Sequence, residues 1–156
     1  RNTFAGVQNR YAFVAGLGRS WTESENGRFK TDVGATYTIQ KDVTPVAGAD
    51  DGFGGLRFTV DAMRKLSETA ELSSLLVVDE NLEETSDVRA DWLTSLSVSI
   101  SDGLALKTSL QLLFDNQPAF LSVPLSPAAG QPTTGNVLTP GEEVDRVFTV
   151  ALVIKL

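Results

Sequence analysis

The sequence contains no cysteine and no histidine. Without cysteine, the chain has no disulfide bond and no thiolate metal site. Without histidine, it has no Ser-His or Cys-His relay, and it lacks the commonest zinc ligand and the usual acid or base at neutral pH. No spacing of carboxylates singles out a catalytic pair either. We therefore expect a protein that is not an enzyme and that holds no metal and no cofactor.

Long apolar runs and an excess of basic residues are also missing. No window approaches eighteen consecutive apolar residues, so we expect no transmembrane helix. The chain opens on Arg1 without a basic leader and an apolar core, so no signal peptide is expected, and an exported protein would be a mature or truncated chain. The net charge of −7 argues against a nucleic-acid partner.

The sequence does contain strict alternation of apolar and polar residues. In the stretch 88–115, two alternating runs flank the turn Ser101-Asp102-Gly103, and an Asp-Gly pair between such runs predicts a β-hairpin. Each arm is about twelve to fourteen residues long, against about five or six for most strands of soluble proteins. A tilted strand that crosses a bilayer needs about nine to eleven residues in the hydrocarbon.

Further alternating runs extend this pattern over the chain. A second hairpin is predicted from 10–21 and 29–40 around a turn at 23–28, and three more strands are predicted at 56–63, 72–79 and 146–156. A helix over 61–76 is the competing prediction for the fourth run. The segments 41–55, 79–87 and 116–145 are expected to be loops, the last because it holds five of the six prolines and no periodicity. Short and long connections then alternate.

The two faces of these predicted strands differ in chemistry. One face is apolar with aromatic residues toward both ends, as expected of lipid-facing aromatic girdles, and the other carries charges, as expected of a lumen. The predicted girdle residues are Tyr11, Trp21, Phe29, Tyr37, Trp92, Phe114 and Phe148. The predicted lumen-facing residues are Lys30, Asp32, Arg57, Asp61, Arg89, Asp91 and Lys107. Arg19 is the exception on the apolar face, where we expect it to reach the headgroups beside Trp21.

The residues themselves predict an all-β fold: an antiparallel up-and-down meander of about seven long strands that forms a transmembrane β-barrel or the C-terminal part of one. The residues 1–156 would form a single outer-membrane domain. Because single-chain bacterial barrels have even numbers of strands, we expect N-terminal strands to be missing. The alternative is a soluble β-sandwich or lipocalin-like binding module, in which the apolar face is a core.

Several short motifs resemble the C-terminal part of the domain-of-unknown-function 481 family, whose members are described as salt-induced outer-membrane proteins. They lie at 11–19, 31–37, 65–70, 101–107 and 115–118. The chain departs from the family pattern at Leu156, where an aromatic residue is common, and over 121–140, which is longer and richer in proline. The resemblance implies further N-terminal strands and a link to salt stress.

From these observations we expect a non-enzymatic protein of the bacterial outer membrane with a structural, envelope-integrity or narrow-pore role. Its expected partners are outer-membrane lipid and other envelope proteins. Acidic residues of the long loops could hold a divalent cation shared with lipopolysaccharide, although solvated acidic loops are the explanation that we favour. These residues are Asp50, Asp51, Asp79, Glu80, Glu83, Glu84, Asp87, Glu142, Glu143 and Asp145.

Overall fold

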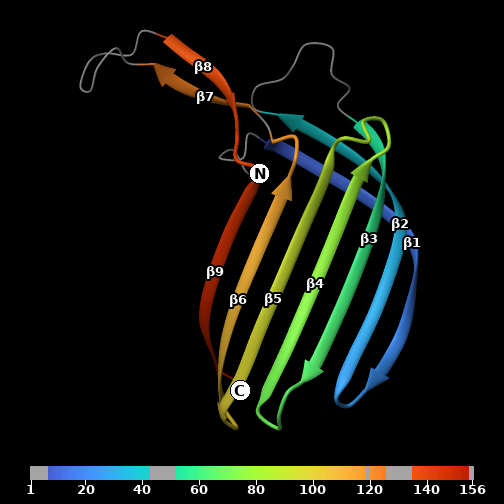
Figure 1. The fold of residues 1–156 in the computed structure, drawn as a ribbon, viewed down its shortest axis with the longest axis vertical. Helices are drawn as coiled ribbons and strands as arrows, with labels where there is room; N and C mark the ends of the chain where they lie inside the picture. The colour runs from blue at the N-terminus through green and yellow to red at the C-terminus, as the bar shows by residue number, and fades with distance from the viewer. Residues whose placement is uncertain (1–6, 43–51, 119, 126–134, 155–156) are drawn as a thin grey trace.

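A computed structural model of the chain describes residues 7–42, 52–118, 120–125 and 135–154, and within these ranges it contains strands and no helix. No membrane-spanning helix is therefore found in the described part of the chain. The main sheet has seven antiparallel strands in sequence order, as Figure 1 shows. They are β1 (Val7–Ser24), β2 (Gly27–Asp42), β3 (Gly52–Lys65), β4 (Ala70–Asn81), β5 (Val88–Ser101), β6 (Leu104–Asp115) and β9 (Val144–Ile154). The predicted all-β meander of long strands is confirmed.

The strands run alternately between two ends of the sheet. One end, the turn end, carries the short connections 25–26, 66–69 and 102–103. The other end, the loop end, carries the connections 43–51, 82–87 and 116–143, each of which is longer than any connection at the turn end. Strands β1, β3, β5 and β9 run from the loop end to the turn end, and β2, β4 and β6 run the opposite way (Figure 1).

Both predicted hairpins are present, and one turn is tighter than expected. In the β5–β6 hairpin, Trp92 pairs with Leu112 and Thr94 pairs with Leu110, so the two apolar sets share a face. The β1–β2 turn consists only of residues 25–26, whereas the sequence predicted a turn over 23–28. Across this turn, the Gly27 backbone N–H donates a hydrogen bond to the Ser24 hydroxyl at 3.1 Å. As a result, Arg28 belongs to β2 and contributes a charge to the sheet.

In the middle of the chain the predicted fourth strand forms and the competing helix does not, and nearer the end one expectation was wrong. The competing helix over 61–76 does not form, because Val60 pairs with Leu76 across the β3–β4 hairpin and these cross-strand pairs outweigh local helix propensity. The predicted loop 116–145 contains a two-stranded sheet formed by β7 (Phe120–Leu125) and β8 (Gly135–Pro140). β7 contains Pro124 and β8 ends at Pro140. Because proline is uncommon in strands, the alternation of apolar and polar residues did not predict this hairpin.

The main sheet is curled, and glycines allow a close approach between β1 and β2. Gly16 pairs with Gly34, and a Cβ atom added to Gly16 would lie 2.5 Å from the Val33 carbonyl oxygen. A Cβ atom on Gly34 would lie 2.9 Å from the Ala15 carbonyl oxygen. Any side chain at these positions would therefore push the two backbones apart, and glycine pairs of this kind permit strong local bending of a sheet.

Candidate functional site

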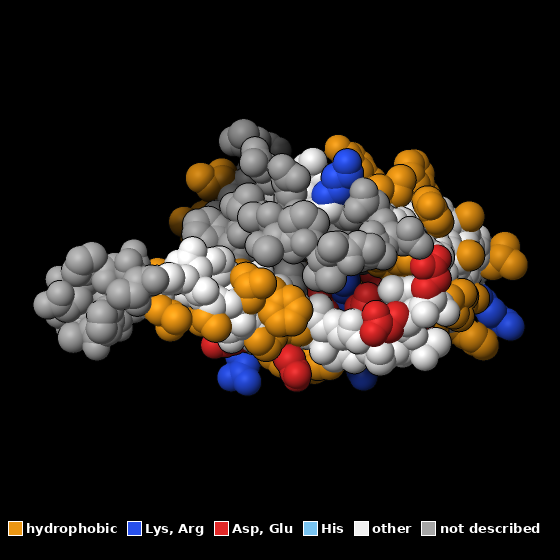
Figure 2. All heavy atoms as spheres, turned by 90° about the horizontal axis from the view of Figure 1, so that it is seen from above, with side chains coloured by type: hydrophobic (Ala, Val, Ile, Leu, Met, Phe, Trp, Pro, Cys, Tyr) orange, Lys and Arg blue, Asp and Glu red, His pale blue; other side chains and the backbone are white. Residues whose placement is uncertain are grey.

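The first feature of the sheet is an apolar face that continues across all seven strands. The apolar face continues from one strand to the next because directly paired residues share a face. Leu17 pairs with Val33 and Val33 with Phe58; farther along, Leu110 pairs with Phe148. Seen from above, hydrophobic side chains lie along the outer margin of the curled sheet (Figure 2).

Burial in this sheet is inverted relative to a soluble globular domain. The apolar face is exposed, with Leu17 83%, Phe148 70% and Ile154 68% accessible to solvent. The most deeply buried polar side chains, Thr38 and Ser95, lie on the opposite face. Ala105 is the one buried hydrophobic residue within the described ranges. A large exposed apolar surface of this kind marks contact with lipid or with another molecule.

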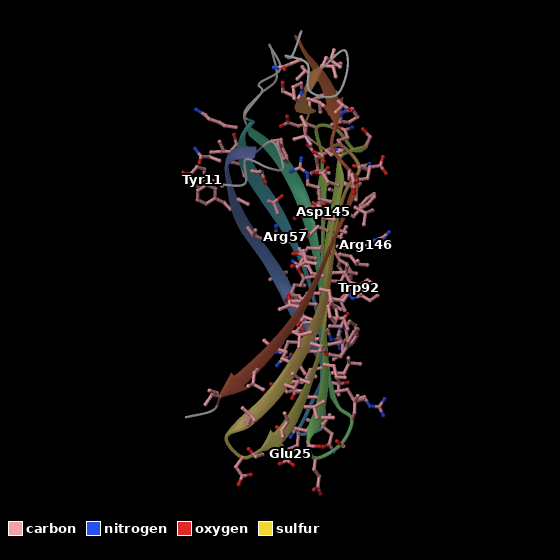
Figure 3. The ribbon with its side chains drawn as sticks, turned by 90° about the vertical axis from the view of Figure 1, so that its left-hand side faces the viewer. Tyr11, Glu25, Arg57, Trp92, Asp145 and Arg146 are labelled. Carbon is pink, nitrogen blue, oxygen red and sulfur yellow. The ribbon has the colours of Figure 1, made fainter. Side chains whose placement is uncertain are left out.

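The predicted girdle residues all lie on the apolar face, in the strands where alternation placed them. All seven are exposed, from 36% for Phe114 to 70% for Phe148. Tyr11 on β1 and Trp92 on β5 lie at opposite outer margins of the curled sheet, with Arg57 between them (Figure 3). Whether lipid headgroups contact these aromatic residues stays a prediction.

The polar atoms of the two tryptophans are satisfied within the sheet. The Trp21 indole N–H donates to the Thr31 hydroxyl at 2.8 Å, and the Trp92 indole N–H donates to the Ser74 hydroxyl at 2.9 Å. Arg19 lies over the Trp21 ring, with its guanidinium carbon 4.3 Å from the ring centroid. This cation-π contact gives the one cation predicted on the apolar face a partner near the turn end.

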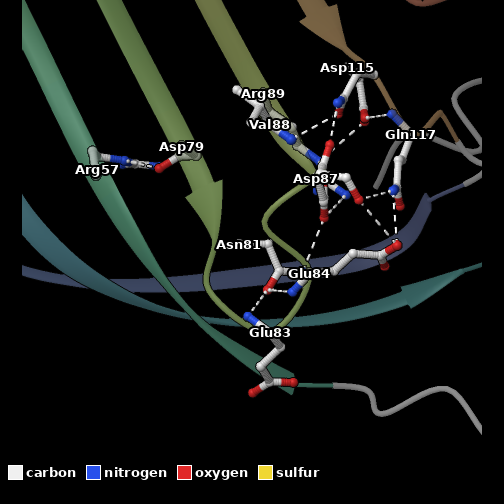
Figure 4. Close-up of polar contacts among 12 residues, drawn as sticks. Arg57, Asp79, Asn81, Glu83, Glu84, Asp87, Val88, Arg89, Asp115 and Gln117 are labelled. Carbon is white, nitrogen blue, oxygen red and sulfur yellow. Dashed lines mark hydrogen bonds and ion pairs between the residues drawn. The ribbon is translucent and has the colours of Figure 1, made fainter.

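The opposite, polar face carries a row of alternating charges near the loop end. Arg57, Asp79, Arg89 and Asp115 are directly paired across β3, β4, β5 and β6. Arg57 donates two hydrogen bonds to the Asp79 carboxylate, at 2.7 and 2.8 Å (Figure 4). Arg89 is 3.2 Å from both the Asp87 and the Asp115 carboxylates. Such parallel guanidinium–carboxylate bonds fix geometry as well as charge.

Amide side chains tie the connection 82–87 to the end of β6 beside this row. The Asn81 side-chain oxygen accepts the backbone N–H of Glu83 at 2.9 Å, and its amide nitrogen donates to Asp87 at 3.3 Å. Directly after β6, the Asn116 side-chain oxygen accepts the Val88 N–H at 2.8 Å, and its amide nitrogen donates to the Ser86 carbonyl. The described part of the loop end is therefore a cross-linked polar network (Figure 4).

All seven predicted lumen-facing residues lie on the polar face, spread over β2, β3, β5 and β6. They do not converge on one point. Arg57 and Arg89 belong to the charge row, Asp61 pairs with Arg28 at 3.1 Å, and Asp91 accepts two hydrogen bonds from Gln111 at 2.9 and 3.0 Å. Lys30 pairs directly with Asp61 in the register, while Asp32 and Lys107 lie in other rows. Their contact with a lumen remains a prediction.

Sequence reasoning missed Arg28 and Asp87 as members of this face. Arg28 was assigned to a turn, and only the two-residue length of the real turn, Glu25-Asn26, would have placed it in the strand. Asp87 was assigned to an acidic loop, but it is 7% exposed and pairs with Arg89. No sequence signal distinguishes it from its acidic neighbours.

The acidic residues proposed for a divalent cation are only partly described. Asp50 and Asp51 lie outside the described residues. Asp79 and Asp87 bind arginines, which occupy their carboxylates. Among the residues that the structure describes, no three acidic side chains converge as a cation site would require. Cation binding at the loop end stays an untested prediction.

The fold and the two faces define a class: an all-β protein built as one long-stranded antiparallel meander, with an exposed apolar face and a charged face. The family described as "Protein of unknown function, DUF481" matches residues 1–122, and the chain belongs to this family. The match ends inside β7. No curated protein and no solved structure matched the chain.

Proposed function

We propose that this chain is a non-enzymatic component of the bacterial outer membrane, inserted as a β-barrel or as part of one. The observation that carries the proposal is the exposed apolar face, which extends over all seven strands. The charges on this face, such as Arg64, Glu80 and Arg146, lie toward strand ends, while the charges at mid-strand lie on the other face. In water, this much exposed apolar surface would drive aggregation. In contact with lipid tails, the same surface is not exposed to water.

Strand length supports a bilayer span. β5 has 14 residues, which at about 3.4 Å per residue gives a strand of roughly 45 Å. Tilted by about 40°, as barrel strands are, it would cover roughly 35 Å, enough to cross a hydrocarbon core about 30 Å thick. Strands of a soluble sheet have no need of this length.

The polar face favours a structural or narrow-pore role over a wide channel. Its arginines pair with carboxylates of the same face, as in the Arg57–Asp79 and Arg28–Asp61 pairs, instead of pointing into open water. Cross-linked charges of both signs fill space and leave little net field to select an ion. We therefore propose a role in envelope integrity or in slow passage of small solutes, and a link to salt stress rests on the family resemblance alone.

The alternative of a soluble β-sandwich or lipocalin-like module requires a second layer over the apolar face, or an apolar face that points inward. In the described part of the chain, the strands of the main sheet make extensive contacts only with their sheet neighbours. The apolar residues point outward (Figures 2 and 3). We therefore do not propose a soluble binding function.

The absence of native cysteine makes a direct test simple. Leu96 on the apolar face and Ser97 on the polar face are neighbours in β5. We expect a fluorophore on Leu96→Cys to be quenched by brominated lipid and protected from aqueous iodide, and a fluorophore on the matched control Ser97→Cys to escape lipid quenching. Equal iodide quenching at both positions, with no lipid quenching, would contradict the membrane proposal.

The choice between the two roles needs a separate measurement. We expect the complete protein in planar bilayers to give small conductance steps if it is a narrow pore. If the Leu96→Cys label shows that the protein is inserted and the bilayer still gives no conductance steps, the pore role is refuted and the structural role remains.

A further inference from the structure

The β7–β8 hairpin is a feature of the loop end that the proposed function does not use. It lies between β6 and β9 in the chain, and it leans away from the seven strands of the main sheet (Figure 1). In the described part of the chain, β7 and β8 make extensive contacts only with each other. The family match stops at residue 122, so most of the hairpin lies beyond it. Neither the family nor the main sheet accounts for this hairpin.

The hairpin exposes apolar side chains on both of its faces. One face, which we call the valine face, carries Leu121, Val123, Leu125 and Val137. The opposite, mixed face also carries polar residues, since Ser122 pairs with Leu138 and Pro124 pairs with Asn136. Val123 and Val137 are 41% and 45% exposed, and Leu138 is 52% exposed. The valine face is therefore the more apolar of the two, and it is open to solvent.

The segment that contains the hairpin is also uncharged. No charged residue occurs between Asp115 and Glu142, although 21% of the whole chain is charged. Surfaces that face water normally carry charged residues of both signs. A surface that is both apolar and uncharged marks a contact with lipid or with another molecule.

The hairpin is poorly suited to recruit another strand. Each of its strands has six residues, β7 contains Pro124, and β8 ends at Pro140. Proline has no backbone N–H to donate to a neighbouring strand. Short strands and prolines are the features with which natural edge strands avoid pairing with another chain. These features disfavour a second copy joined edge to edge and favour a partner that offers only apolar surface.

The attachment of the hairpin keeps its base close to the membrane surface. In the proposed function, on which this inference rests, the loop end lies at one surface of the bilayer. Residues 141–143 join Pro140 to Val144 at the start of β9, so these two residues are at most about 14 Å apart. Val144 pairs with Phe114 on the apolar face of the main sheet. The apolar face therefore reaches the point at which the hairpin is attached.

We propose that the β7–β8 hairpin lies on the membrane surface, with its valine face among the lipid headgroups and the first carbons of the acyl chains. Burial of Val123 and Val137 there removes apolar side chains from water, while Ser122 and Asn136 on the mixed face stay hydrated. Because the segment is uncharged, the contact depends on apolar burial and needs no anionic lipid. The hairpin thereby holds the connection between β6 and β9 away from the polar face of the main sheet.

Depth-dependent fluorescence quenching in phosphatidylcholine vesicles tests this proposal. A fluorophore is placed on Val123→Cys, on the matched control Ser122→Cys at the preceding position of β7, and on Leu96→Cys in the main sheet. We expect Val123→Cys to lose more fluorescence to a nitroxide on the lipid headgroup than to one near the end of the acyl chain, and Leu96→Cys to show the reverse order. Ser122→Cys should be quenched mainly by aqueous iodide. High salt should leave the quenching at Val123→Cys unchanged.

Three results would overturn the hairpin proposal while lipid quenching at Leu96→Cys shows that the main sheet is inserted. Iodide quenching as strong at Val123→Cys as at Ser122→Cys, with no lipid quenching, would show that the hairpin lies in water. Excimer emission from pyrene on Val123→Cys would show that a second copy covers the valine face. Loss of lipid quenching in high salt would show an electrostatic contact. Absence of lipid quenching at Leu96→Cys itself would refute the membrane proposal, and the hairpin proposal with it.

Discussion

Leu110 and Gln111 are neighbours in the middle of β6 and lie on opposite faces of the sheet, so the same substitution at each tests what covers those faces. Leu110 is 44% exposed on the apolar face, between Thr94 and Phe148. Gln111 lies on the polar face, with its amide nitrogen 2.9 and 3.0 Å from the two Asp91 carboxylate oxygens. We propose to replace each in turn by arginine.

The expected costs differ by several kcal/mol. If lipid covers the apolar face, Leu110→Arg places a guanidinium near the bilayer midplane and costs about 2–4 kcal/mol. At a urea m-value of about 2 kcal/mol per molar, the unfolding midpoint in lipid vesicles would fall by about 1–2 M. Gln111→Arg sets its guanidinium beside Asp91 and should change the free energy of unfolding by no more than about 0.5 kcal/mol.

Water on the apolar face would give a different result. A half-exposed leucine on a solvated surface tolerates arginine to within about 0.5 kcal/mol. Equal urea midpoints for Leu110→Arg and Gln111→Arg, measured by tryptophan fluorescence in the same vesicles, would therefore refute the lipid-facing assignment. Substitution of the neighbouring polar-face residue controls for general damage to β6.

Two further predictions concern stability and use the same urea assay. Arg57→Ala leaves the half-buried Asp79 carboxylate without its two hydrogen bonds and should cost about 1–3 kcal/mol; the double variant with Asp79→Ala should recover part of this loss, and a double variant as unstable as the sum of the single ones would rule out the coupling. Gly34→Ala brings a Cβ atom to 2.9 Å from the Ala15 carbonyl and should cost about 1–3 kcal/mol, whereas the control Gly54→Ala meets no atom within 4 Å and should leave the midpoint unchanged; equal losses would show that the β1–β2 approach is not tight.

The sequence predicted most strands because a strand with one apolar face shows a two-residue alternation of apolar and polar side chains. The β5–β6 hairpin and the final strand alternate without interruption, and both form, the final strand over Val144–Ile154 with residues 155–156 outside the described part of the chain. The β7–β8 hairpin has no such period, since its strands are short and contain proline, and it was missed. The helix considered over 61–76 failed because helix propensity is local, while the β3–β4 pairing that replaces it joins residues such as Phe58 and Val78.

The amino-acid sequence alone determined which residues share a face. Successive side chains of an extended backbone point to opposite sides, so Leu110 and Gln111 are separated whatever else the chain does. The tertiary structure decided which strand positions lie opposite one another, and with them which charges meet. Arg57 with Asp79, Arg28 with Asp61, and Arg89 between Asp87 and Asp115 depend on register and on the true length of each turn. A shift of the pairing by one residue would turn the apolar residues of one strand to the polar face, and in these hairpins the length of each turn fixes that register.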